Sequence, residues 1–176
     1  MNIVLIGMPG CGKSTIGPLL GRPFYDADAE IERTEHRTIV DVFATDGEAY
    51  FRRVEHETVR RLSALDGVTI ATGGGVVKDP KNMAVLKRHG WLVFLHRPPE
   101  LVTTDNAERP LLRGHGPQRP SGVAAVNDEA PSPLSPWALL YRERLPLYRQ
   151  YADIEVLNDG APEECAARIL EGMSTL

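Results

Sequence analysis

Cysteine and long apolar runs are both scarce in this chain of 176 residues. The two cysteines, Cys11 and Cys165, are too few for a disulfide scaffold, and the dispersed histidines form no cluster with zinc-site spacing. The apolar run after Met1 breaks at Gly7, which is too short for a signal peptide, and no later run reaches membrane-spanning length. We therefore expect a reduced, cytoplasmic protein that contains no membrane segment.

An excess of positive charge is also missing. Lys and Arg total 20 against 24 Asp and Glu, which gives a formal net charge of −4. This balance argues against nucleic-acid or acidic-membrane binding through the field of the whole protein, so an anionic ligand must be held by local groups. A hydrophobic content of 42% excludes wholesale disorder, and the length fits a single domain.

Short apolar runs alternate with helical patterns along the chain, which predicts a parallel α/β sheet with right-handed crossovers. The runs predict strands at 3–6, 24–26, 68–71, 91–95 and 154–156. The helical patterns and capping signals predict helices at 27–35, 39–44, 48–65, 80–89, 136–148 and 162–173, with a short helix after Pro98-Pro99.

Proline marks two exceptions to this alternation. Pro18 tolerates only the first turn of a helix, so the helix that begins at Lys13 should be short or kinked. Residues 110–136 contain six of the 14 prolines and three glycines, with little periodicity. This composition is typical of a mobile loop.

The segment from Gly7 to Ser14 matches the phosphate-loop pattern G-x-x-x-x-G-K-[ST] without a gap. Its glycines let backbone N–H groups surround phosphates, and the following helix N-terminus adds positive potential. Lys13 can bridge the β- and γ-phosphates, and the Ser14 hydroxyl can bind Mg²⁺. Because the pattern lies between a predicted buried strand and a predicted helix, it predicts a site that binds a nucleoside triphosphate.

Further motifs extend along nearly the whole chain, and together with the phosphate loop they resemble the shikimate kinase family. They are Gly7–Thr15, Asp26-Ala-Asp28 with Glu30-Ile-Glu32, Gly47-Glu48, Phe51-Arg52-Arg53 with Glu55, Gly73-Gly74-Gly75, Arg109-Pro-Leu-Leu112, and Tyr141 to Tyr148. The resemblance implies a three-layer P-loop fold with a five-stranded parallel sheet in the order 2-3-1-4-5. It also implies transfer of the ATP γ-phosphoryl group to the 3-hydroxyl of shikimate.

The same resemblance implies one kinase domain over 1–176, with a substrate-binding region at about 27–62 and a mobile lid at about 108–136. Arg109 matches the lid arginine that reaches the transferring phosphate and contacts ATP. Mg²⁺ would be bound by Ser14 and, through water, by Asp26. The other positions implied to contact ATP are Gly10, Cys11, Gly12, Lys13, Ser14 and Thr15.

Shikimate is a hydroxy-carboxylic acid, so its site needs a cation for the carboxylate and an acceptor for the reacting hydroxyl. Arg52 and Arg144 match the positions that hold the carboxylate, and a guanidinium can do so with two parallel bonds. Asp28 matches the carboxylate that orients the ring hydroxyls and accepts a proton. Gly74 lies in a turn after a predicted strand, where open α/β sheets bind ligands. The implied catalytic residues are Lys13, Asp28 and Arg109.

The chain departs from the family pattern in three places. The piece between Ser14 and Asp26 is shorter by roughly one helical turn, about 3.6 residues, and the piece from Arg109 to Arg144 is longer. Family members often carry arginines beside the adenine, but 102–106 and 158–161 contain none. The nucleotide preference therefore stays open.

Two other functions remain compatible with these residues. One is a related kinase of another polyol or cyclitol acid, of the gluconate type. The other is a nucleotide-binding regulatory module with weak catalysis. For the leading hypothesis the partners are ATP and shikimate, without nucleic acid or membrane, and the resemblance implies a monomer.

Overall fold

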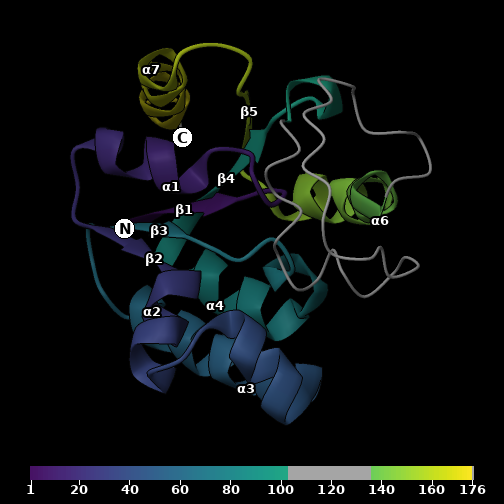
Figure 1. Ribbon diagram of the computed structural model, residues 1–176. Helices are drawn as coiled ribbons and strands as arrows, with labels where there is room; N and C mark the ends of the chain where they lie inside the picture. Colours follow the sequence, from purple (N-terminus) through teal and green to yellow (C-terminus); the bar gives the residue numbers. More distant parts are fainter. Residues whose placement is uncertain (103–135, 176) are drawn as a thin grey trace.

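The computed structural model of the protein describes residues 1–102 and 136–175. Five strands form one parallel sheet in the order β2-β3-β1-β4-β5 (Figure 1). This order confirms the fold that the sequence motifs imply. The strands are β1 (Asn2–Ile6), β2 (Phe24–Asp26), β3 (Thr69–Ala71), β4 (Gly90–His96) and β5 (Ile154–Leu157).

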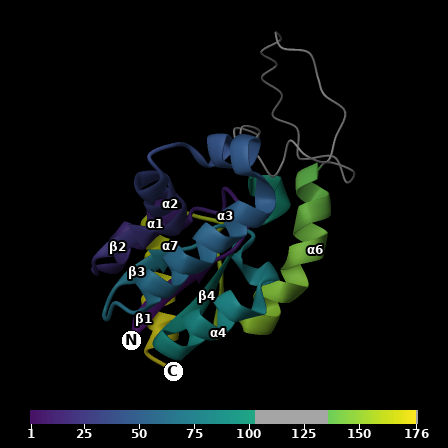
Figure 2. The same ribbon diagram turned by 90° about the horizontal axis from the view of Figure 1, so that it is seen from below.

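Helices cover both faces of the sheet. The α-helices are α1 (Lys13–Ile16), α2 (Ala27–Glu35), α3 (Ile39–Ser63), α4 (Pro80–His89), α6 (Pro136–Tyr151) and α7 (Pro162–Met173). Three short 3₁₀ helices are η1 (Gly17–Leu20), η2 (Val76–Lys78) and η3 (Pro99–Leu101). Seen from below, α3 and α4 lie across one face of the sheet with α6 beside them (Figure 2).

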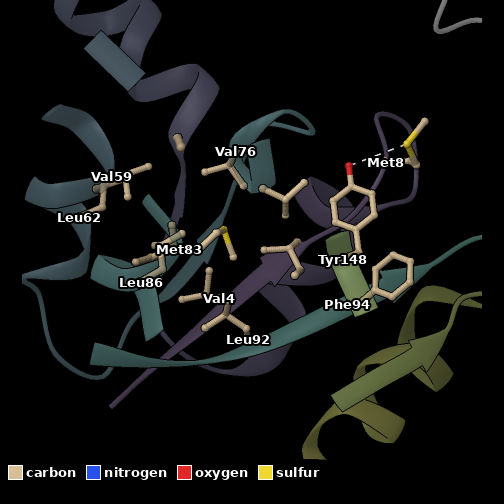
Figure 3. Close-up of a cluster of buried hydrophobic side chains, with 14 of the residues drawn as sticks. Val4, Met8, Val59, Leu62, Val76, Met83, Leu86, Leu92, Phe94 and Tyr148 are labelled. Carbon is tan, nitrogen blue, oxygen red and sulfur yellow. Dashed lines mark hydrogen bonds between the residues drawn. The ribbon is translucent and has the colours of Figure 1, made fainter. Parts of the chain in front are cut away.

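The side chains of β1 divide between two cores because successive residues of a strand point to opposite faces. Val4 and Ile6 belong to the core under α3, α4 and α6, which Figure 3 shows. Ile3 and Leu5 belong to the core under α1 and α7. All four are fully buried, as expected of a central parallel strand covered on both faces.

Local sequence signals account for most element boundaries. Pro18 limits α1 to four residues, and the chain continues as the 3₁₀ helix η1, so the prediction of a short helix is confirmed. The two helices predicted at 39–44 and 48–65 are confirmed as two parts of α3, which ends at Ser63, two residues earlier than predicted. A break inside α3 lies at Gly47, whose φ of 79° and ψ of 179° are open to glycine alone.

Most of the predicted lid at 108–136 lies outside the described residues. In the described part of the chain, no helix combines the length and the apolar character that crossing a bilayer requires.

Candidate functional site

The phosphate-loop motif joins β1 to α1 and packs tightly against the ends of two other strands. A Cβ at Gly7 would lie 2.6 Å from the Leu95 carbonyl oxygen at the end of β4. A Cβ at Gly12, where φ is +96°, would lie 2.7 Å from Nδ2 of Asn158, which follows β5. Asn158 also donates to the Cys11 carbonyl at 2.9 Å. Glycine is therefore required at both positions by close contact as well as by backbone geometry.

Lys13 is buried inside this loop with 7% of its surface exposed. Its Nζ donates to the carbonyl oxygens of Gly7 and Met8, both at 2.9 Å, and approaches Cys11 Sγ at 3.5 Å. A positive charge is thus held by the loop whose pattern predicts phosphate binding. Cys11 itself is 1% exposed.

Asp26, at the end of β2, uses its two carboxylate oxygens for different purposes. Oδ1 accepts from the backbone N–H groups of Asp28 and Ala29 and so caps α2. Oδ2 accepts from the Ser14 hydroxyl at 2.5 Å. A hydroxyl and a carboxylate oxygen are hard ligands of the kind that Mg²⁺ prefers when phosphate oxygens and water complete its shell. The two predicted metal-binding residues are therefore adjacent.

A cavity of about 300 Å³ brings seven of the predicted site residues together, at the carboxyl end of the sheet. They are Gly10, Gly12, Lys13, Ser14, Thr15, Asp26 and Asp28. Glu32 and Thr72, to which the motifs assign no role, also line it. The lining residues thus include one ammonium, three hydroxyls and three carboxylates, which suits a reaction between a phosphate group and a hydroxyl.

Cys11, Arg52, Gly74 and Arg144 do not line this cavity, and Arg109 lies outside the described residues. Cys11 is a buried residue of the loop itself. Gly74 lies in the three-glycine turn that follows β3, and Arg52 packs against that turn. Arg144 lies in α6, four residues before Tyr148, whose hydroxyl donates to the Gly74 carbonyl.

Arg52 in α3 packs against that turn, since a Cβ at Gly75 would lie 2.9 Å from its NH1. NH1 forms an ion pair with buried Glu55 at 2.8 Å, while Nε and NH2 contact exposed Glu48 at 3.3 and 3.2 Å. Burial raises the pKa of Glu55, and the Arg52 guanidinium opposes that shift. Burial alone lowers the pKa of Arg52, but its attraction to Glu55 prevails and the pKa is raised.

The sequence motifs include Glu55 but assign it no role. A Cβ at Gly73 would lie 2.8 Å from Asp28 Oδ1 and 3.2 Å from Glu55 Oε1, so both carboxylates face the same point of the turn. Glu55 follows Arg52 by three positions on one helix, and residues three apart are neighbours on a helix surface. This spacing was the available signal for the pair.

Arg144 in α6 is only 2% exposed, yet its Nε and NH1 have no hydrogen-bond partner among the described residues. Unpaired buried guanidinium nitrogens are costly, because a charge removed from water needs compensation. An anion bound beside Arg144 would supply that compensation.

A second cavity, of about 210 Å³, lies against Gly10, Gly12 and Thr15, which also line the first. Its other lining residues are Ile16, Arg97, Asn158, Gly160 and Pro162. Arg97 follows β4 directly, and its Nε donates to the Leu101 carbonyl at 2.9 Å. Arg97 lies before the segments 102–106 and 158–161, where the family pattern places its adenine-side arginines, so the pattern did not predict a role for it. Its position just after a buried strand was the available signal.

Comparison with known proteins gives one consistent result. Residues 9–174 match the model of the shikimate kinase family. A shikimate kinase from Clostridium botulinum (strain Alaska E43) is 39% identical, over 96% of this chain and 94% of that protein.

Solved structures give the same picture. Shikimate kinase from Acinetobacter baumannii in complex with shikimate has a TM-score of 0.83 at 34% identity, covering 99% of this chain and 93% of that one. Shikimate kinase from Aquifex aeolicus has a TM-score of 0.78 at 35% identity, covering 99% and 96%. A sugar kinase from Janibacter, 18% identical with a TM-score of 0.57, shares the fold.

The two carboxylates that contact Arg52 provide a matched test of how the arginine is held. Glu55→Gln removes the charge of a buried partner and should lower the free energy of unfolding by about 1–3 kcal/mol. Glu48→Gln removes an exposed partner and should cost less than about 0.5 kcal/mol. Urea unfolding of both variants measures the difference. Equal losses would contradict the view that Glu55 is the carboxylate that fixes Arg52.

Proposed function

Because the chain belongs to the shikimate kinase family, it is an ATP-dependent kinase of shikimate, and we propose that its cavity beside Lys13 and Asp28 is where phosphoryl transfer takes place. The observation that carries this proposal is the meeting of the phosphate loop with the Asp28 carboxylate in one cavity. The γ-phosphoryl group of ATP would pass there to the 3-hydroxyl of shikimate.

The proposed roles follow from charge and position. The loop N–H groups and the Lys13 ammonium hold the phosphates and stabilise the charge on the transferring group. Asp28 accepts a hydrogen bond from the attacking hydroxyl and takes its proton as that oxygen bonds to the γ-phosphorus, while the bond from the γ-phosphorus to the bridging oxygen breaks and ADP leaves with that oxygen. Positioning and charge stabilisation carry most of the acceleration in phosphoryl transfer, so Asp28 acts first by orienting the hydroxyl. The participation of Arg109 stays a prediction.

The substrate carboxylate is assigned to Arg52 and Arg144. Arg144 supports this assignment because two of its buried nitrogens have no partner in the described part of the chain. Arg52 is held by Glu55 and lies against the glycine turn that includes Gly74. Arg52 lies in the region of about 27–62 that is proposed to bind substrate.

Ser14 and Asp26 are the residues proposed to hold Mg²⁺, with Asp26 acting through water. Their hydroxyl and carboxylate oxygens are 2.5 Å apart, and both residues line the cavity beside Lys13. When bound there with ATP, the ion would neutralise charge on the β- and γ-phosphates. Asp26 would keep its capping role at the same time, because that role uses its other oxygen.

The cavity beside Arg97 is proposed to take the base end of ATP. It lies against the same loop glycines as the first cavity, and its lining residues, all within the described ranges, include no carboxylate. Arg97 would then supply the positive charge that other members carry at later positions. A guanidinium against an aromatic base contributes about 0.5–2 kcal/mol.

That the enzyme is monomeric and cytoplasmic remains a prediction.

The proposed reaction is tested with purified protein, Mg²⁺ and ATP, by coupled measurement of ADP release. We expect release that depends on shikimate, with little on quinate or gluconate. Turnover on gluconate alone would contradict the assignment and favour the gluconate-type kinase. Nucleotide binding without transfer to any of the three acids would favour the regulatory module.

Asp26 allows the metal role to be separated from helix capping. Asparagine caps helices about as well as aspartate, so Asp26→Asn should keep the unfolding free energy within about 0.5 kcal/mol of the wild-type value. The same variant should need more Mg²⁺ for activity and lower kcat at least about tenfold. Asp26→Ala should lose about 1 kcal/mol of stability as well. Mg²⁺ titration of activity and urea unfolding measure the two effects. An Asn variant with a normal Mg²⁺ requirement would remove the metal role.

Arg97→Ala should raise the KM for ATP about fivefold, which corresponds to about 1 kcal/mol, and leave the KM for shikimate unchanged. The KM for ATP of Arg97→Lys should fall between those of the wild type and Arg97→Ala, since lysine keeps the charge and loses the planar group. Arg22→Ala is the control, because Arg22 also donates to one carbonyl, that of Met1, but at the amino end of β1. Equal ATP KM values for the two alanine variants would rule out the role of Arg97.

A further inference from the structure

The three-glycine turn has its carbonyl groups held in two different ways. The Gly73 and Gly75 carbonyls accept from the backbone N–H groups of Val76 and Lys78, both at 3.1 Å, as the chain enters η2. The Gly74 carbonyl between them accepts from the hydroxyl of Tyr148 at 2.5 Å. The middle of the turn therefore depends on a side chain of α6, far away in the sequence.

That hydrogen bond fixes a whole peptide group. A peptide is planar and its C=O and N–H point in opposite directions, so holding the Gly74 oxygen also sets the direction of the Gly75 N–H. The restraint matters because glycine has more backbone freedom than any other residue. Without the hydrogen bond from Tyr148, little within the turn itself would oppose rotation of this peptide.

Tyr148 is itself rigidly held and can serve as a fixed point. It is fully buried, and its ring stacks on Phe94 of β4 with centroids 5.0 Å apart (Figure 3). The hydroxyl lies 3.8 Å from Met8 Sδ in the phosphate loop. Burial raises the pKa of Tyr148 above its usual range, so the hydroxyl stays protonated and remains a donor.

The turn held by Tyr148 touches the proposed substrate-binding groups on several sides. A Cβ at Gly75 would meet the Arg52 guanidinium at 2.9 Å, and a Cβ at Gly74 would meet Pro9 of the phosphate loop at 2.7 Å. Arg144 precedes Tyr148 by four residues and therefore lies on the same face of α6, one turn away. The hydroxyl thus connects the helix that carries one arginine to the turn on which the other packs.

We propose that Tyr148 is a positioning residue of the shikimate site, which sets the Gly74–Gly75 peptide and the placement of Arg144 relative to Arg52. This inference rests on the proposed function and adds a residue to which the sequence motifs give no role. Tyr148 need not contact the substrate. Its effect should therefore fall on shikimate binding rather than on ATP binding.

Tyr148→Phe is the direct test, because it keeps the stacked ring and removes only the hydroxyl. Its control is Tyr141→Phe in the same helix, where the lost hydroxyl contacts His96 Nε2 at 2.8 Å instead of the glycine turn. We expect Tyr148→Phe to raise the KM for shikimate about tenfold and the KM for ATP less than about twofold. Tyr141→Phe should change neither KM by more than about twofold.

Several results would overturn the inference. One is an equal KM for shikimate in Tyr148→Phe and Tyr141→Phe. Another is a rise in the KM values for both shikimate and ATP in Tyr148→Phe that parallels a loss of folded protein measured by thermal melting. Wild-type protein that binds ATP but does not phosphorylate shikimate would overturn the proposed function, and the role of Tyr148 with it. Wild-type turnover with an unaffected Tyr148→Phe variant would overturn the role of Tyr148 alone.

A second variant keeps the inference testable if Tyr148→Phe does not fold. Phe94→Leu keeps the Tyr148 hydroxyl but removes the ring on which the Tyr148 ring stacks, so the hydroxyl is held less firmly against the Gly74 carbonyl. We expect a smaller rise in the KM for shikimate, about threefold, with the KM for ATP unchanged. A folded Phe94→Leu variant with a normal shikimate KM would contradict the inference.

Discussion

The central position of β1 constrains everything at the active edge of the sheet. β1 pairs with β3 on one side and β4 on the other, and both of its faces are covered by helices. The loop that leaves it must therefore fit between the glycine turn after β3 and the ends of β4 and β5. Gly7 and Gly12 are pressed against Leu95 and Asn158, and Gly74 is pressed against Pro9. The glycines permit this contact, which brings the phosphate loop and the substrate turn together.

The cations at this edge differ in the partners that compensate their charge. Lys13 is held by two carbonyl oxygens and Arg52 by the Glu55 carboxylate. Arg144 keeps two buried nitrogens without a partner among the described residues. Lys13 and Arg52 would share or exchange these partners when an anion binds, whereas Arg144 has two donor groups already available. This difference supports the proposal that Arg144 binds the shikimate carboxylate.

The sequence predicted the parts of the site that depend on neighbouring residues. The helices at Pro162–Met173 and Pro80–His89 and the short helix limited by Pro18 were all predicted from signals within a few positions of each other. The phosphate loop was recognisable for the same reason, since its pattern occupies eight consecutive residues. The sheet order followed from the family resemblance and not from periodicity, which gives strands but no neighbours.

Only the tertiary structure revealed what surrounds Arg97, Glu55 and Tyr148, although the sequence carried a local signal for the first two. Arg97 lines a cavity between the ends of two strands, Glu55 lies beside the Gly73 turn, and Tyr148 donates to a carbonyl group 74 residues away. The chemistry of this protein was therefore determined by its sequence, because reactive residue types and loop glycines are local properties. Their mutual placement was decided by the packing of α3 and α6 against one sheet edge, because long-range contacts depend on the whole fold.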